Sequence, residues 1–188
     1  MKLTRIQNTF LWKKYCQEKQ NQEELTMLPP REIMLFHGTK LNAPEKIYLD
    51  KEESFKNNYA ADSNMFGRGI YFAKEASYSD SGYAFQTATG TKEMLYCKVN
   101  VGECQVMQSH EGRPDMKDTD IRDHNRNIRY GCRKSNYQGS DIYIIYSTGR
   151  AYPEYLIEYS NTVPGYPQPN RRVQGTGTYG GLGRNIIS

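Results

Sequence analysis

The sequence of 188 residues lacks any long apolar run. No apolar stretch in it approaches the length of roughly 20 residues that a membrane-spanning helix requires. The N-terminal segment is also unlike a secretory signal, because it has no continuous apolar core. We therefore expect a soluble chain without membrane association, working inside the cell in the cytoplasm, the nucleus or both.

Metal-ligand spacings are missing as well. The four cysteines, Cys16, Cys97, Cys104 and Cys132, form no C-x-x-C pair, and the three histidines do not cluster with them. Free thiols in a reducing compartment are the ordinary interpretation, and no metal is expected. The formal net charge of +4 is mild, and a dedicated nucleic-acid binder usually carries a denser basic stripe. A nucleic-acid partner is therefore not favoured, and a monomer is the default expectation.

Apolar residues are few for a compact enzyme, at 37%, but 16 tyrosines and 6 phenylalanines supply much of the area that a core can bury. Tyrosine also carries a hydroxyl, so many of these rings are suited to the wall of a hydrated pocket. The length fits one domain of ordinary size with a real core.

Short strands and few helices are predicted by the hydrophobic pattern. Asn8 is the expected N-cap of the first helix, and Pro29 and Pro30 bar a helix from the connector at 21–32. The expected helices cover 8–20, 44–49 and 74–83, and the expected strands cover 33–36, 67–73, 94–101, 103–108, 142–146 and 155–159. This mixture indicates an α+β fold.

Three segments lack a clear period. Residues 50–66 form a loop whose length hints at a lid, and residues 109–140 are polar and irregular. Residues 161–188 change abruptly to Gly, Pro, Asn and Thr, a composition that predicts a flexible tail.

The chemistry-bearing motifs are LFHGTK at 35–40, MFGRGIYFAKEASYS at 65–79 and IYIIYSTGRAYPEYLI at 142–157. Each alone has an ordinary explanation: a structural histidine at 37, a tight turn at Gly67 and Gly69. In this order, from about Leu11 to Tyr159, they resemble the catalytic domain of the poly(ADP-ribose) polymerase family. The likeness is closest to members that transfer single ADP-ribose units. It implies an ADP-ribosyltransferase fold over residues 1–160, with two packed, mostly antiparallel sheets and a few flanking helices.

The resemblance also implies NAD⁺ as co-substrate. Cleavage of its nicotinamide–ribose bond requires the flat ring to be held rigidly while the sugar is presented to a nucleophile. Gly38 would bind the carboxamide through its backbone, and Ser79 would add a hydroxyl. Tyr71 would stack on one face of the ring and Tyr83 on the other.

Other residues are expected to bind the adenosine half of NAD⁺. By the same resemblance, His37 and Thr39 would meet hydroxyls of the adenosine ribose, and the loop at 50–66 would gate entry on the adenine side. Phe72 and Ala73, which follow Tyr71 in the same motif, complete the set of expected cofactor-binding residues.

The third catalytic position sets the type of reaction. Polymer-forming members carry a glutamate there, whereas this chain has Ile142, giving the set His37, Tyr71 and Ile142. Isoleucine cannot hydrogen-bond a ribose hydroxyl, so we expect single-unit transfer without polymer. A slip of one residue would instead turn Asp141 toward the site, and that register question stays open on the sequence.

An active mono-ADP-ribosyltransferase acting on protein side chains, including its own, is the leading hypothesis. One alternative is a pseudoenzyme that binds NAD⁺ or a partner without turnover. Another is ADP-ribosylation of a nucleic-acid end, steered by arginines of the tail. Glu75, His110 and His124 are interpreted as solvated surface residues.

Overall fold

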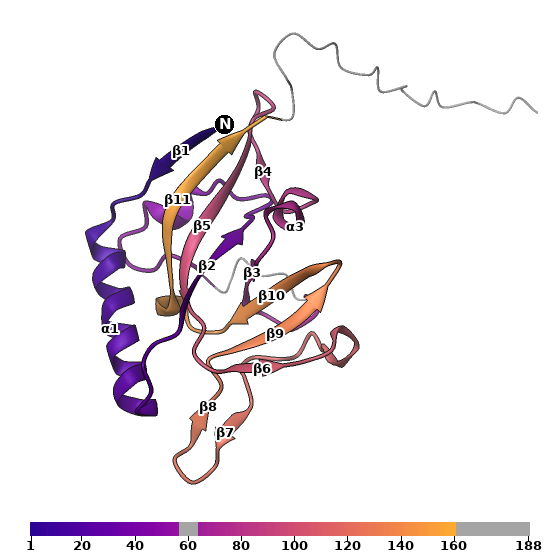
Figure 1. The fold of residues 1–188 in the computed structure, drawn as a ribbon. Coiled ribbons are helices and arrows are strands. Elements are labelled where there is room, and N and C mark those ends of the chain that lie inside the picture. Colours follow the sequence, from indigo (N-terminus) through magenta and orange to yellow (C-terminus); the bar gives the residue numbers. More distant parts are fainter. Residues whose placement is uncertain (57–63, 161–188) are drawn as a thin grey trace, which may run out of the picture.

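The computed structural model describes residues 1–56 and 64–160. The tail predicted at 161–188 and the middle of the loop predicted at 50–66 lie outside the described residues. Within them the chain forms a nine-stranded mixed sheet, a separate two-stranded ribbon and a few short helices beside one long one (Figure 1). The expected α+β class is confirmed.

One half of the sheet is built from long antiparallel neighbours. Its strands, in spatial order, are β1 (Lys2–Arg5), β11 (Ala151–Tyr159), β5 (Lys92–Asn100) and β2 (Glu32–His37), with β4 (Phe85–Gln86) paired to the start of β5. The apolar alternation of 94–101 and the run at 33–36 predicted two of these strands. They carry the main hydrophobic core, including Leu35, Leu95 and Val99.

The other half consists of β3 (Ile70–Ala73), β10 (Ser140–Ile145), β9 (Cys132–Tyr137) and β6 (Cys104–Val106). The two halves meet at β2 and β3, where Phe36 and Ala73 are the one registered pair. In contrast, β2 pairs with β5 along its whole length, from Glu32 to His37. The halves therefore diverge beyond this junction, and an opening is left beside the end of β2.

The first helix, α1 (Thr9–Thr26), begins as predicted. The side chain of Asn8 accepts hydrogen bonds from the backbone N–H groups of Phe10 and Leu11. The predicted end at residue 20 was wrong, because the following Gln- and Glu-rich segment continues the helix. It stops at Met27, which adopts the left-handed conformation two residues before Pro29.

The two shorter helices are α2 (Glu45–Tyr48) and α3 (Ala76–Asp80), both within the predicted ranges but shorter than them. The segment at 103–108 does form a strand, β6, but it was expected to pair with β5 after the turn at Gly102. It pairs instead in parallel with β9, in register from Cys104↔Cys132 to Val106↔Lys134.

The expectation that 109–140 is irregular was wrong. The segment contains the short 3-10 helix η2 (Ser109–Glu111), the ribbon strands β7 (Ile121–Asp123) and β8 (Ile128–Arg129), and the whole of β9. The sequence of β9 shows no hydrophobic alternation, because polar side chains occupy several of its buried positions. Arg133 is only 4% exposed, and it donates hydrogen bonds to Met107 Sδ and to the carbonyl oxygen of Asp118.

Candidate active site

The opening beside the β2–β3 junction is a cavity of about 470 Å³. Its wall comes from the end of β2 and the turn after it, from α2 and β3, from α3 with the segment that follows, and from the neighbouring strands β9 and β10. Every residue predicted for the site lines it: His37, Gly38, Thr39, Tyr71, Phe72, Ala73, Ser79, Tyr83 and Ile142. Residues more than 100 positions apart in the chain thus share one surface, as a single binding site requires.

Gly38 holds two backbone segments in close contact. A Cβ atom at this position would overlap the main-chain carbonyl group of Tyr83 and lie 2.6 Å from its Cβ. The neighbouring amide of Lys40 donates a hydrogen bond to the carbonyl oxygen of Tyr83, 2.7 Å away. Glycine is therefore required here for the approach of the Tyr83 segment, in addition to any contact with a ligand.

The imidazole of His37 has a defined tautomer. Its Nδ1 lies 2.7 Å from the carbonyl oxygen of Tyr71, which can only accept, so Nδ1 carries the proton and Nε2 is left as an acceptor. Phe55 and Phe72 pack on the ring at centroid distances of 5.1 and 5.3 Å. Burial lowers the pKa of His37, outweighing the hydrogen bond to Tyr71, so the ring is neutral at physiological pH.

Tyr71 is fixed at both ends. Its backbone belongs to β3, and its hydroxyl accepts a hydrogen bond from the N–H of Phe66 at 2.8 Å while donating one to the carbonyl oxygen of Gly67 at 2.9 Å. Burial raises its pKa, so the hydroxyl stays protonated. Gly67 adopts a φ of +70°, and a Cβ there would collide with the backbone of Met116. The ring orientation of Tyr71 therefore depends on a turn that needs glycine.

Two further tyrosines on the wall, Tyr78 and Tyr137, were not predicted. Tyr78 stacks on the predicted Tyr83, whose side chain is 42% exposed, at a ring-centroid distance of 5.4 Å and an angle of 19° between the ring planes. Tyr137, at the end of β9, meets Tyr78 edge-on at 6.4 Å. The position of Tyr78 next to Ser79 could have marked it, but Tyr137 lies in the segment that the sequence pattern left irregular.

Two residues that carry a hydroxyl group line the cavity, Thr39 and Ser79. Thr39 Oγ1 is buried and has no hydrogen-bond partner among the described residues. A buried hydroxyl without a partner is costly, and ligand binding can remove that cost. Ser79, on α3, is 3% exposed and lines the cavity.

Ile142 and Asp141 lie on opposite faces of β10. Ile142 is 3% exposed, pairs with Ala73 of β3 and lines the cavity. The carboxylate of Asp141 points elsewhere, toward the ammonium of Lys134 at 2.8 Å and the amide of Asn136 at 3.1 Å. Those partners lower the pKa of Asp141, Lys134 most of all. The register with the isoleucine facing the cavity is the one that the structure has.

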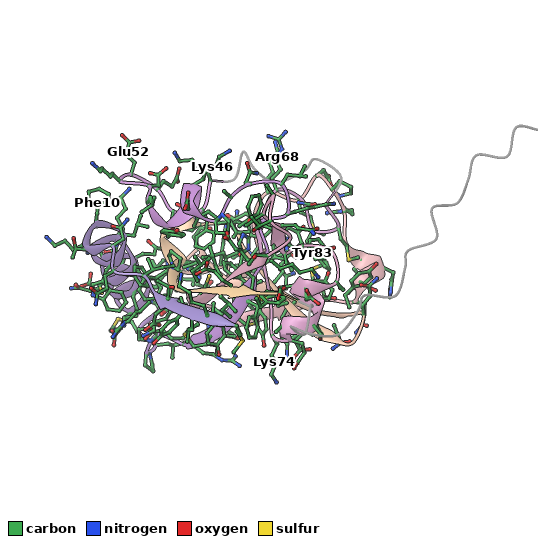
Figure 2. The ribbon with its side chains drawn as sticks, turned by 90° about the horizontal axis from the view of Figure 1, so that it is seen from above. Phe10, Lys46, Glu52, Arg68, Lys74 and Tyr83 are labelled. Atoms are coloured by element: carbon green, nitrogen blue, oxygen red, sulfur yellow. The ribbon has the colours of Figure 1, made fainter. Side chains whose placement is uncertain are left out.

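Three lysines lie on the described wall of the cavity, and one of them, Lys56, is paired with Asp50 at 2.7 Å. Lys40, Lys46 and Lys56 line it, and no carboxylate does among the described residues. Figure 2 labels Lys46 along the same edge of the molecule as Arg68. Sequence reasoning did not single out these lysines, because isolated lysines in loops and short helices are ordinary surface residues.

Two features are absent from the part of the chain that the structure describes. No cluster of three or more His, Cys, Asp or Glu side chains is arranged to hold a metal ion. No helix in residues 1–56 and 64–160 has the length and apolarity to cross a membrane.

Comparison with known proteins shows which family the chain resembles. The profile of the poly(ADP-ribose) polymerase catalytic domain matches residues 1–161. A Dictyostelium discoideum protein named "Probable poly [ADP-ribose] polymerase" is 31% identical over 174 residues, which are 87% of this chain and 45% of that protein. Mouse protein mono-ADP-ribosyltransferase PARP11 is 28% identical over 177 residues, 84% of this chain and 51% of the relative.

Human protein mono-ADP-ribosyltransferase PARP14 is 28% identical over 160 residues, 84% of this chain but 8% of the relative. The chain thus spans about half, or much less, of the length of these relatives. Because the family profile matches residues 1–161 of 188, the protein belongs to the poly(ADP-ribose) polymerase catalytic domain family.

Proposed function

We propose that this chain cleaves NAD⁺ between nicotinamide and ribose and transfers one ADP-ribose unit to an acceptor, in the main a protein side chain, its own included. The observation that carries the proposal is the shared cavity. His37, Tyr71 and Ile142 face it from three different strands, together with the glycine and hydroxyl groups expected to grip nicotinamide.

The tyrosines, Gly38 and Ser79 on the cavity wall suit nicotinamide. Tyr71 offers a ring that its two hydrogen bonds hold in place, and Tyr83 offers a second, more exposed ring whose stacking partner is Tyr78. The carboxamide has donors and an acceptor that the backbone of Gly38 and the hydroxyl of Ser79 can match. Holding the ring in this way orients the bond that must break.

Other residues on the same wall suit the adenosine half of NAD⁺ and its phosphates. The lysines at 40 and 46 offer cations to the two phosphates, and Lys56, which is paired with Asp50, lines the same cavity. His37 Nε2 is an acceptor for a ribose hydroxyl, and Thr39 Oγ1 is an unpartnered hydroxyl next to it in the chain. The cavity wall therefore has cationic and hydrogen-bonding groups that the dinucleotide would use.

Ile142 supports single-unit transfer. Polymer growth requires a group that hydrogen-bonds the hydroxyl of an ADP-ribose acceptor, and an aliphatic side chain has none. Asp141 does not supply it, because its carboxylate is paired with Lys134 on the opposite face of the strand. The relatives' names include both a polymerase and mono-ADP-ribosyltransferases, and the isoleucine of this chain is the feature that favours the second activity.

The acceptor must then bring its own nucleophile. Since no described carboxylate lines the cavity, an acceptor carboxylate, already ionised at neutral pH, is the group that needs least help from the enzyme. As it attacks the ribose carbon, the bond to nicotinamide breaks and nicotinamide leaves as a neutral molecule. Release of the label by hydroxylamine would identify such an ester linkage.

The test is incubation of the protein with NAD⁺ labelled in its adenylate half, in the presence of protein and of RNA. We expect label on protein, free nicotinamide in equal amount, and loss of both with Tyr71→Ala. Label on RNA would favour nucleic-acid ends as the acceptor. NAD⁺ binding without nicotinamide release would identify a pseudoenzyme, and nicotinamide release without labelled acceptor would identify a hydrolase.

A further inference from the structure

Cys104 and Cys132 face each other away from the cavity. They are registered partners in the parallel pair of β6 and β9, and their Sγ atoms are 3.0 Å apart. Both are free thiols, as are Cys16 and Cys97. No role in ADP-ribose transfer is assigned to either of the paired thiols, so their proximity needs a separate explanation.

The backbone around the pair suits a disulfide bond. Neighbouring strands lie about 4.8 Å apart, inside the range of about 4.4–6.8 Å that disulfides need between Cα atoms. Because the two residues are in register, both side chains leave the sheet on the same face. Only a movement of about 1 Å would bring the sulfurs to the bonded distance of about 2 Å.

The two thiols differ in reactivity. Cys104 is half-buried on an edge strand, whereas Cys132 is completely buried, so an oxidant reaches Cys104 first. The hydrogen bond from the Cys132 thiol, with Arg31 and Lys134 nearby, lowers the pKa of Cys104. The same hydrogen bond and burial raise the pKa of Cys132. An accessible, acidified thiol beside a protonated partner is typical of a reversible redox pair.

We infer that Cys104 and Cys132 form a reversible disulfide when the protein meets hydrogen peroxide. The Cys104 thiolate attacks one peroxide oxygen, the O–O bond breaks, and Cys104 becomes a sulfenic acid as hydroxide leaves and is protonated to water. The Cys132 sulfur then attacks the Cys104 sulfur, the S–O bond breaks, and the departing hydroxide takes the Cys132 proton as a second water. The two thiols supply the two electrons that reduce the peroxide.

The disulfide would stabilise a segment that supports the site. After β6, the N–H of Met107 bonds to the carbonyl oxygen of Lys134, and the chain continues to Met116, whose backbone packs on Gly67. Gly67 in turn accepts the hydrogen bond of the Tyr71 hydroxyl. Closing the loop between residues 104 and 132 restricts the unfolded chain, and we expect the melting temperature to rise by about 5 °C or more.

The experiment treats the whole reduced protein with hydrogen peroxide, blocks remaining thiols with an alkylating agent, and maps peptides without reduction. We expect one cross-linked peptide pair joining Cys104 to Cys132, lighter by two hydrogen atoms than the two free peptides. Dithiothreitol should reverse both the cross-link and the rise in melting temperature. In Cys132→Ser, Cys104 should stop as a sulfenic acid that dimedone traps.

Cys16→Ser is the matched control, because Cys16 is half-buried but lies on α1 without a neighbouring thiol among the described residues. It should form the cross-link as the unchanged protein does. The inference would be overturned if Cys104 went on to sulfinic acid while Cys132 remained a thiol. A cross-link that involves Cys16 or Cys97 in place of this pair would overturn it as well. This test needs no NAD⁺, so its result does not depend on the proposed function.

Discussion

The Nδ1–H of His37 donates a hydrogen bond to the main-chain carbonyl oxygen of Tyr71 across the gap between β2 and β3, at a distance of 2.7 Å. This bond joins the two halves of the sheet at the place where their backbone pairing has ended at Phe36 and Ala73. It also sets the tautomer of the imidazole and keeps Nε2 free for a ligand. Two of the proposed catalytic residues are thus positioned by one interaction.

Acid should weaken the folded state through His37. Its pKa is lowered by burial from 6.5, so below that pH the unfolded chain binds a proton that the folded protein does not. The contribution of neutral His37 to stability is therefore complete above pH 6.5 and falls as the pH drops toward the lower pKa of the folded state. Denaturant unfolding of the unchanged protein and of His37→Gln between pH 7.5 and 5 should show a smaller pH dependence in the variant. Equal pH dependence in the two proteins would refute the assignment. His110→Gln, at an exposed position, is the control and should keep the pH dependence of the unchanged protein.

Thr39→Val should separate ligand binding from stability. The substitution removes the buried Oγ1, which has no partner among the described residues, and keeps the shape of the side chain. We expect the melting temperature to stay the same or rise, while the KM for NAD⁺ rises about 5- to 10-fold, the value of about one hydrogen bond. Steady-state kinetics and thermal unfolding measure both. A lower melting temperature with an unchanged KM would mean that the hydroxyl serves the fold alone.

Gly38→Ala should damage the site through a single methyl group. Its Cβ would overlap the backbone of Tyr83, so the second ring of the proposed nicotinamide slot must move, at a cost of about 1–3 kcal/mol in the free energy of unfolding. We expect at least about a 100-fold fall in nicotinamide release, since a shift of about 1 Å can cost that much.

Gly82→Ala is the matched control for this variant, because a Cβ there has no atom within 4 Å. It lies next to Tyr83 in the chain, yet it should retain the activity and stability of the unchanged protein. Equal activity in the two variants would contradict the role given to the close approach at Gly38.

Tyr71→Phe and Tyr71→Ala should differ in kind. Phe keeps the stacking face but loses the hydroxyl that binds the 66–67 turn, so unfolding should become easier by about 1–2 kcal/mol while measurable transfer remains. Ala removes the ring as well, and transfer should disappear. Chemical denaturation and nicotinamide release would detect these effects. Full loss of activity in the Phe variant at unchanged stability would assign the hydroxyl itself to the reaction.

The sequence predicted the parts of the fold whose hydrophobic period is regular. The buried run before His37, the alternating strand around Leu95 and the Asn8 cap are where they were expected. The family resemblance is confirmed by the profile match, and the residues carried over from it share one cavity. Their individual roles stay predictions.

The remainder depends on tertiary partners that local patterns do not reveal. β9 was missed because Arg133 is buried, and only distant residues such as Asp118 supply its hydrogen bonds. The parallel pairing of β6 with β9 joins segments that no turn connects, so the partner of Cys104 could not be derived from its neighbours. The cavity-lining residue Tyr137 was not predicted, because it belongs to the strand β9 that the sequence pattern did not indicate.

Mass spectrometry of the modified acceptor peptides bears most closely on whether Ile142 limits the product to one unit. With NAD⁺ in excess and long incubation, every modified side chain should carry a single ADP-ribose, and added time should recruit new sites without lengthening old ones. Chains of two or more units on one side chain would contradict the account. They would mean that another group performs the task that an isoleucine at this position cannot.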